Sequence, residues 1–152
     1  MEASKEEGLR IGLIPEKKFE TKCIQNRIVY VSTRKFEGWT NLLDKINGDY
    51  LLLIHNKLLK IDVKGGAISK ESILNFVGDY FVIFENSNES ASEGLVFTPR
   101  VLKNLIFEKP DKYFDAMALS GEPGILYSRL IQLKDYAVTI SDFFKSLNTT
   151  KL

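Results

Sequence analysis

The sequence of 152 residues contains only one cysteine and one histidine, which excludes several kinds of chemistry. With Cys23 alone, no disulfide can form within the chain, and a zinc site built from cysteines is not expected. A single cysteine is compatible with a reducing compartment. With His55 alone, mechanisms that need two histidines are excluded, including the zinc proteases that bind their metal through paired histidines. Any catalysis must therefore rest on Asp, Glu, Lys, Ser, Thr, Tyr or Arg side chains.

The chain also lacks an excess of charge and long apolar stretches. It has 21 basic and 20 acidic residues, a formal net charge of +1. Proteins that coat nucleic acid non-specifically are usually strongly basic, although this balance is compatible with a local basic patch. No apolar run approaches the ~20 residues needed to cross a bilayer. The first eight residues lack the apolar segment of a signal peptide. We therefore expect a soluble, cytoplasmic protein without a membrane partner.

What remains is the composition of an ordinary globular domain, with 44% hydrophobic and 27% charged residues. A chain of this length fits one domain and buries roughly two-thirds of its unfolded surface. It needs no disulfide or metal to fold. We expect residues 1–14 to form an N-terminal leader and residues 15–152 to form a single domain.

Local patterns predict an α/β fold, with one central mixed sheet flanked by helices. A helix is expected at 15–25, because Pro15 suits a first helical turn and Phe19 and Cys23 share a face. Ser69 is the expected N-cap of a later helix. The other expected elements are a strand at 27–32, a helix at 36–46, a hairpin at 49–64, a helix at 69–76, a strand at 79–85, a loop at 86–93, a strand at 95–98 paired with the preceding one, a helix at 99–107, a turn at 120–124 and a helix at 135–147.

The hairpin at 49–64 is the most informative segment. A two-residue turn at His55–Asn56 pairs the chain outward from Ile54 and Lys57, which places Asp49 directly opposite Asp62. Lys64 follows on the same face, because strand side chains alternate. We expect Asp62 to stand at a strand end, facing away from the core. The core face collects the apolar residues Tyr50, Leu52, Ile54, Leu59, Ile61 and Val63.

Two opposed carboxylates beside an ammonium group indicate a cation site. Cβ atoms directly opposite in a hairpin lie about 4.5–5.5 Å apart, so the two carboxylates repel each other unless a positive group lies between them. Mg²⁺ binds carboxylate oxygens and keeps several waters. Water bound to the metal is a nucleophile, and Lys64 is placed to stabilise a phosphate in the transition state. Such a site suits hydrolysis of a phosphodiester.

The pattern of Gly48-Asp49, twelve residues, and then Asp62-Val63-Lys64 resembles the signature of the PD-(D/E)XK nuclease superfamily. The order of expected elements over residues 15–107 is also similar to that of the family, especially its small archaeal and phage members related to Holliday junction resolvases. Gly48 stands where the family usually has proline, and Asp62 stands where glutamate is commoner. The resemblance implies a restriction-endonuclease-like core.

The resemblance also implies residue roles. Asp49 and Asp62 would bind Mg²⁺ or Mn²⁺ together with the backbone carbonyl of Val63, and Lys64 would act on the transition state. The family's upstream helix often supplies a third acid, for which Glu20 or Glu16 is the matching candidate. The alternative is a solvent-exposed helix acid at this position.

Two functions remain open at this point. The first is a metal-dependent endonuclease acting on DNA, with a junction-resolving or restriction-like role. One domain holds one active site, so cutting both strands implies a symmetric homodimer, with the apolar face of the C-terminal helix as a candidate dimer surface. The second is a non-catalytic module on a degenerate nuclease-like fold, binding nucleic acid or a protein partner.

Two further features allow a structural or a functional interpretation. The segments 48–56 and 78–86 both begin Gly-Asp-Tyr. The structural interpretation is that Asp49, like Asp79, is a turn residue at the start of a strand. The N-terminal part is locally basic, either as a solvated face or as a rim that contacts phosphates. The basic residues concerned are Lys17, Lys18, Lys22, Arg27, Arg34 and Lys35.

Overall fold

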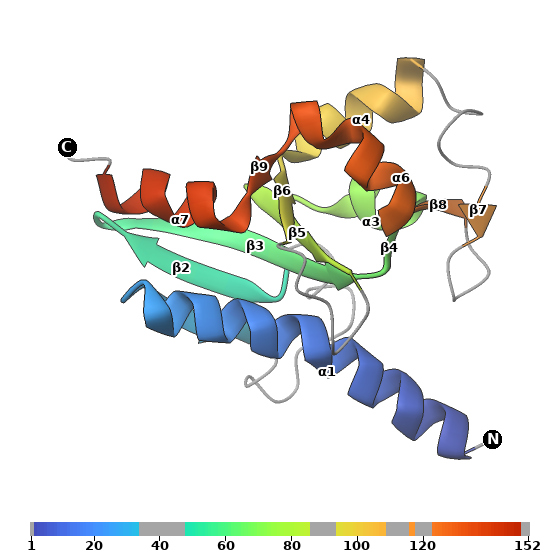
Figure 1. The fold of residues 1–152 in the computed structure, drawn as a ribbon, viewed down its shortest axis with the longest axis horizontal. Coiled ribbons are helices and arrows are strands. Elements are labelled where there is room, and N and C mark those ends of the chain that lie inside the picture. The colour runs from blue at the N-terminus through green and yellow to red at the C-terminus, as the bar shows by residue number, and fades with distance from the viewer. Residues whose placement is uncertain (1, 34–47, 86–93, 109–115, 118–122, 150–152) are drawn as a thin grey trace.

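A central six-stranded sheet with helices on both faces forms the body of the molecule (Figure 1). The structure is a computed structural model, and it describes residues 2–33, 48–85, 94–108, 116–117 and 123–149. In spatial order the strands are β1 (Val29–Ser32), β2 (Tyr50–Ile54), β3 (Lys57–Gly65), β5 (Tyr80–Phe84), β6 (Leu95–Phe97) and β9 (Val138–Thr139).

The sheet is mixed, as the sequence predicts. β3 and β5 run parallel, and every other neighbouring pair in the sheet is antiparallel. A second, three-stranded sheet that the sequence did not predict lies beside the first. It consists of β4 (Ala67–Ser69), β8 (Pro123–Leu126) and β7 (Ala116–Met117), in that order.

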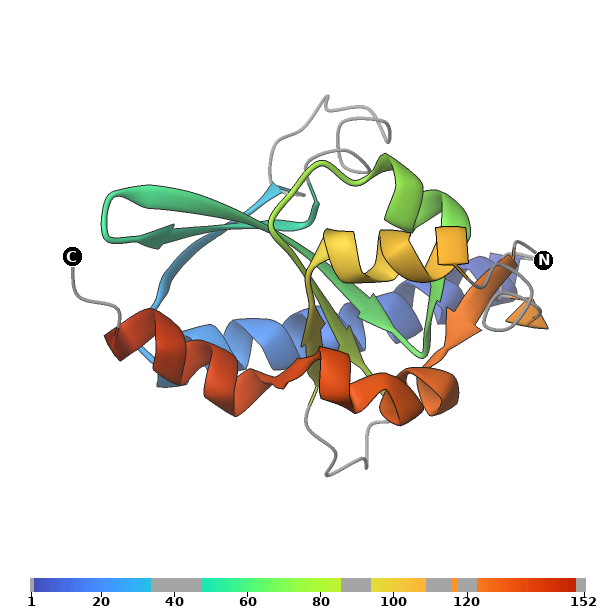
Figure 2. The ribbon, with the colours of Figure 1, turned by 90° about the horizontal axis from the view of Figure 1, so that it is seen from above.

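Helices cover both faces of the central sheet (Figure 2). On one face lie α1 (Glu2–Gln25) and α7 (Ile140–Thr149), whose Phe19 and Phe144 rings are 6.0 Å apart. On the other face lie α3 (Lys70–Asn75), α4 (Pro99–Glu108), α6 (Tyr127–Leu130) and the 3₁₀ helix η2 (Ile131–Tyr136). Each face therefore has its own hydrophobic cluster, and strand residues alternate between the two clusters.

The predicted hairpin register is confirmed. Tyr50 pairs with Ile61 and Ile54 pairs with Lys57. The two turn residues, His55 and Asn56, have φ angles of 47° and 65°. Positive φ at both central residues defines a type I′ turn, whose twist matches that of the flanking strands.

Several other elements agree with the sequence prediction to within a few residues. These are β1, α3, β5, β6 paired with β5, and α4. The expected N-cap of α3 is confirmed, because the Ser69 hydroxyl accepts a hydrogen bond of 3.1 Å from the Ser72 backbone amide.

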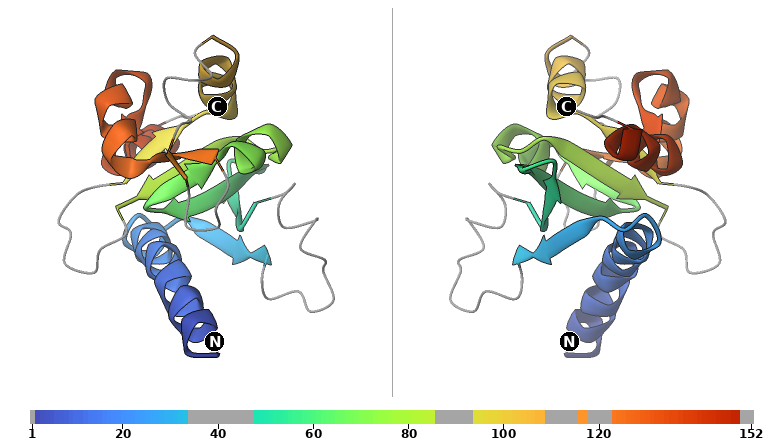
Figure 3. Two further views of the ribbon diagram at one scale, coloured as in Figure 1. Left: turned by 90° about the vertical axis from the view of Figure 1, so that its right-hand side faces the viewer. Right: turned by 90° about the vertical axis from the view of Figure 1, so that its left-hand side faces the viewer.

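The predicted start of the first helix is wrong. α1 begins at Glu2, so Pro15 lies inside the helix instead of in its first turn, and the expected leader is helical. The first half of α1 extends beyond the sheet (Figure 3). Proline is unfavourable in a helix interior because it lacks an N–H group. Here Pro15 packs so closely on β3 that a Cβ atom added to Gly65 would lie 2.4 Å from its Cγ atom.

The predicted start of the last helix is also wrong. Tyr136 belongs to η2 and is 64% exposed, and β9 intervenes before α7 begins at Ile140. The Thr139 hydroxyl accepts a hydrogen bond of 3.2 Å from the Asp142 amide at the start of α7. Phe143 and Phe144 are buried in the chain's own core, so the apolar face of α7 is not free to serve as the expected dimer surface.

Some predictions fall outside the described residues: the helix at 36–46, the loop at 86–93, the first part of the turn at 120–124, and Arg34 and Lys35. Pro123 and Gly124, at the end of that turn, begin β8. Among the helices that the structure describes, none is long and apolar enough to cross a membrane.

Candidate active site

Asp49 lies directly before β2 and is held by three backbone contacts. Its amide donates to the Ile61 carbonyl at 2.9 Å, and its carbonyl accepts from the Thr33 amide at 2.9 Å. The buried Thr33 hydroxyl also donates to the carbonyls of Gly48 and Asp49. The Val63 amide donates to Asp49 Oδ2 at 2.9 Å. This last bond fixes the carboxylate against β3.

The backbone at Gly48 excludes the proline that is usual at this position of the nuclease motif that the sequence resembles. Its φ angle is +79°, which the ring of proline cannot adopt. A Cβ atom at this position would lie 2.6 Å from the Ile61 carbonyl oxygen and 2.9 Å from the Phe76 ring. The turn that presents Asp49 to β3 therefore requires glycine.

Asp62 differs from the sequence expectation in its surroundings. It lies within β3, between β2 and β5, and it is only 5% exposed. The expected exposed strand end is wrong because β5 pairs in parallel along the other edge of β3, with Phe81 as the partner of Asp62. Phe81 belongs to the hydrophobic cluster under α3 and α4. The face of the hairpin that bears Asp62 therefore also lies against a hydrophobic cluster.

Asp49, Asp62 and Lys64 are brought together. The ammonium nitrogen of Lys64 lies 3.4 Å from Asp62 Oδ2, and the Lys64 side chain is 32% exposed. Burial raises the pKa of Asp62 well above its usual 3.8. The positive charge of Lys64 lowers the pKa of Asp62. The Asp49 carboxylate lies close enough to Asp62 to raise the pKa of the Asp62 carboxyl group further, through its charge and through hydrogen bonding. The two carboxyl groups can share a proton because both cannot easily be charged side by side.

Glu20 lies with tyrosines instead of with these two aspartates. Its carboxylate oxygens accept from the Tyr50 hydroxyl at 3.0 Å and from the Tyr30 hydroxyl at 3.2 Å. Glu16 is buried at 6% exposure, and its charge raises the pKa of Tyr50, after the larger effect of burial. Burial and Glu20 likewise raise the pKa of Cys23 to about 12.

The donor set fits a hard divalent cation. Asp49 and Asp62 offer neighbouring carboxylate oxygens, and a cation bound between them would offset the repulsion of their two charges. No group of three or more Asp, Glu, His or Cys side chains in the described part of the chain is arranged to hold a metal. Mg²⁺ commonly keeps several waters and uses one or two carboxylates, so two acids are sufficient.

Sequence reasoning did not identify the residues that support the backbone around Asp49. Thr33 and Tyr50 have no motif of their own and are recognisable only once β1 and α1 are in place. The Gly-Asp-Tyr repeat was the available signal for Asp79. Its Oδ2 atom accepts from the Lys60 amide at 2.8 Å, just as Asp49 accepts from the Val63 amide. Both aspartates thus fasten the start of a strand to β3, and Asp49 in addition lies near the Asp62 carboxyl group.

The fold has a counterpart among solved structures. A 1.6 Å structure of Hjc, a Holliday junction resolvase from the archaeal hyperthermophile Archaeoglobus fulgidus, is similar to this chain with a TM-score of 0.50 and 9% sequence identity. The similarity covers 88% of this chain and 99% of that one. No protein-family model and no curated protein sequence matches the chain. The restriction-endonuclease-like core expected from the Asp49, Asp62 and Lys64 pattern is thereby confirmed: this chain has the fold of an archaeal Holliday junction resolvase.

Proposed function

We propose that the protein is a metal-dependent phosphodiester hydrolase that acts on DNA in the cytoplasm, as a junction-resolving or restriction-like endonuclease. The observation that carries this proposal is the proximity of the Asp49 and Asp62 carboxyl groups beside Lys64, on a nuclease-like fold. A structural role alone does not account for a buried second carboxyl group, because Asp49 already has its backbone partner in Val63.

Asp49, Asp62 and the Val63 carbonyl would hold Mg²⁺ or Mn²⁺. When bound, the cation would supply an activated water and neutralise charge on the phosphate. The Asp62 carboxyl group must give up its proton before it can bind a cation, since metal ligands are deprotonated. The Val63 amide keeps Asp49 Oδ2 in place during this exchange. The Lys64 ammonium then stabilises negative charge that develops on the phosphate.

Glu20 has a supporting role in this proposal. Glu20 reaches the site through Tyr50, which directly follows Asp49 in the chain. We therefore propose that Glu20 fixes Tyr50 and the start of β2, instead of binding the first cation itself. Cutting both strands of DNA would require two copies of the site, and a two-fold symmetric homodimer supplies them.

Calorimetric titration with Mn²⁺ tests the metal site. The wild-type protein should bind Mn²⁺, and Asp49→Asn should reduce its affinity by at least ~10-fold, because one carboxylate ligand is lost. Asp79→Asn is the matched control, since Asp79 stands in the same Gly-Asp-Tyr context and likewise accepts from a β3 backbone amide, that of Lys60. Equal affinities for wild type and Asp49→Asn would exclude these aspartates as the metal site.

One observation favours the alternative of a non-catalytic nucleic-acid- or protein-binding module. The raised pKa of Asp62 favours its neutral form, which can persist as a buried hydrogen-bonded pair without any cation. In that case DNA or protein binding would be unchanged by EDTA, and no Mn²⁺ would bind at Asp49 and Asp62.

A further inference from the structure

Thr33 directly follows β1 and carries a hydroxyl group that takes no part in the proposed chemistry. The residue is 2% exposed. Its hydroxyl oxygen lies 2.9 Å from the Gly48 carbonyl oxygen and 3.1 Å from the Asp49 carbonyl oxygen. A hydroxyl group has one proton to donate, so the two carbonyls share it. The Thr33 amide also donates to the Asp49 carbonyl at 2.9 Å, so Thr33 binds the peptide groups on both sides of Asp49.

The peptide group between Gly48 and Asp49 is the one that most needs a fixed partner. Gly48 has no Cβ atom and a φ angle of +79°, so sterics restrain its ψ angle little. A peptide group rotates through ψ of one residue and φ of the next, so rotation here changes φ of Asp49 and the direction of its side chain. The Gly48 carbonyl is buried with the Thr33 hydroxyl as its partner, and rotation would leave it without a hydrogen bond.

The direction of the Asp49 side chain decides whether its carboxylate reaches β3. Asp49 Oδ2 accepts from the Val63 amide at 2.9 Å, and the Asp49 amide donates to the Ile61 carbonyl at 2.9 Å. These two bonds hold Asp49 from the β3 side. The bonds from Thr33 hold it from the β1 side, so both neighbouring strands fix the residue at the start of β2.

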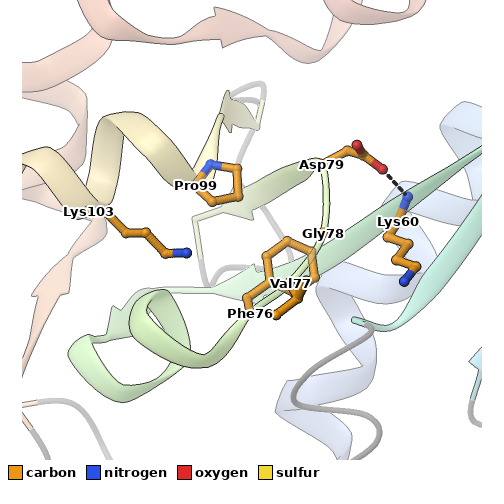
Figure 4. Close-up of a pocket in the computed structure, with 7 residues that line it drawn as sticks. All are labelled: Lys60, Phe76, Val77, Gly78, Asp79, Pro99 and Lys103. Carbon is orange, nitrogen blue, oxygen red and sulfur yellow. Dashed lines mark hydrogen bonds between the residues drawn. The ribbon is translucent and has the colours of Figure 1, made fainter.

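The second Gly-Asp-Tyr segment shows that a strand can begin in this way without such a hydroxyl. The Asp79 amide donates to the Lys60 carbonyl at 2.9 Å, and Asp79 Oδ2 accepts from the Lys60 amide at 2.8 Å (Figure 4). Gly78 has no positive φ angle, and within the described part of the chain no side chain donates to its carbonyl. The hydroxyl bond therefore accompanies the strand that begins with the candidate metal ligand.

We propose that Thr33 is a positioning residue, whose hydroxyl fixes the peptide group between Gly48 and Asp49 and thereby orients the Asp49 carboxylate for binding a cation. This inference rests on the proposed function, because it takes Asp49 as a metal ligand. Thr33 acts only through Asp49 and contacts neither cation nor phosphate. Loss of a partner that orients a metal ligand commonly lowers metal affinity by roughly 10–100-fold.

Two measurements on the full chain test this role. The first is NMR hydrogen exchange of the Val63 amide in EDTA, because this amide donates to the Asp49 carboxylate. Thr33→Val replaces the hydroxyl by a methyl group, and it should speed this exchange at least ~10-fold relative to the amides of α4. The second is calorimetric titration with Mn²⁺, in which Thr33→Val should lose about 10-fold or more in affinity. Thr33→Ser retains the hydroxyl and should restore both values.

Thr139→Val is the matched control. The Thr139 hydroxyl accepts from the Asp142 amide at 3.2 Å at the start of α7, so this variant also loses a threonine hydrogen bond, but outside the site. It should leave the Val63 exchange and the Mn²⁺ affinity at their wild-type values. If Thr33→Val does not fold, Thr33→Ala removes the hydroxyl without adding a methyl group and replaces it in both measurements.

The outcomes separate this inference from the proposed function. If Thr33→Val behaves like Thr139→Val in either measurement while the wild type binds Mn²⁺, Thr33 serves stability alone and the inference is wrong, whatever the wild type cleaves. If Thr33→Val speeds the Val63 exchange and Thr33→Ser restores it, while the wild type neither binds Mn²⁺ nor cuts DNA, then Thr33 still orients Asp49 and the nuclease proposal is wrong.

Discussion

At the residue scale, the candidate site is defined by Asp62, a buried carboxyl group whose pKa is raised. Asp62 is 5% exposed, lies near the Asp49 carboxylate, and is 3.4 Å from the Lys64 ammonium group. Its pKa is raised chiefly by burial. A proton and a cation therefore compete for the Asp62 carboxyl group, and its raised pKa widens the pH range over which the proton is held.

This competition predicts a pH dependence of stability in EDTA. Because the folded pKa of Asp62 lies above its unfolded value, its contribution to stability is complete below about pH 3.8 and is lost as pH rises through the folded pKa. Asp62→Asn is nearly isosteric and cannot titrate. The free energy of unfolding of the wild type, measured with urea, should therefore fall relative to that of Asp62→Asn as the pH rises above about 4.

Added Mn²⁺ provides the control for that measurement. At about pH 8 it should raise the unfolding free energy of the wild type and leave Asp62→Asn nearly unchanged, because a cation that binds only the folded state stabilises it. A difference between the two proteins that stays constant with pH, or grows in favour of the wild type as pH rises, would contradict the assignment.

The Glu20 carboxylate gives a second prediction at the same scale. Tyr50 is 1% exposed and donates to Glu20 at 3.0 Å, whereas the half-buried Tyr30 donates at 3.2 Å. Tyr50→Phe should lower the free energy of unfolding by about 2 kcal/mol, since water cannot replace a buried hydrogen bond to a charged group. Tyr30→Phe should cost less than about 1 kcal/mol, because water can reach its partner. Equal losses in urea denaturation would show that the Tyr50 hydroxyl is not a special support of this segment.

At the scale of elements, the hairpin formed by β2 and β3 sets the geometry of the site through its turn. Both turn residues have positive φ and are exposed. Asn56→Gly should therefore raise the unfolding free energy by about 0.5 kcal/mol, and Asn56→Val should lower it by about 1–2 kcal/mol. Lys57→Val, one residue further on in an exposed strand position, is the control and should change stability by less than about 0.5 kcal/mol. A stable Asn56→Val variant would argue against the type I′ turn.

Elements specified by neighbouring residues are the ones that the sequence predicted well. The turn at His55–Asn56 fixes the pairing of Tyr50 with Ile61, and Ser69 caps α3 through its own hydroxyl. The start of α7 was misplaced because β9 exists only by pairing with β6, which lies about forty residues earlier in the chain. The small second sheet likewise depends on long-range pairing of β4 with β8. Such pairings leave little trace in a local pattern.

At the scale of the whole molecule, the same distinction applies to the site. The contact of Asp49, Asp62 and Lys64 follows from hairpin register and strand alternation, so it could be predicted. The burial of Asp62 could not, because it depends on the parallel strand β5 and on the cover of α3 and α4. The position of Glu20 depends on where α1 crosses the sheet. At that point the hydroxyl groups of Tyr30 in β1 and Tyr50 in β2 donate hydrogen bonds to its carboxylate. The fold is similar to that of a resolvase although only 9% of the residues are identical. A similar arrangement of helices and strands therefore forms from two largely different sequences.

The central claim is that a cation held by Asp49 and Asp62 hydrolyses DNA, and cleavage of a labelled four-way junction tests it most directly. Wild-type protein should cut the junction with Mg²⁺ or Mn²⁺ and stop when EDTA is added. Asp62→Asn should bind the junction yet cut it at least ~100-fold more slowly, because loss of the metal removes both the activated water and the neutralised phosphate. An Asp62→Asn protein that cuts at the wild-type, EDTA-sensitive rate would contradict the account, and so would a wild-type protein that binds the junction and never cuts it.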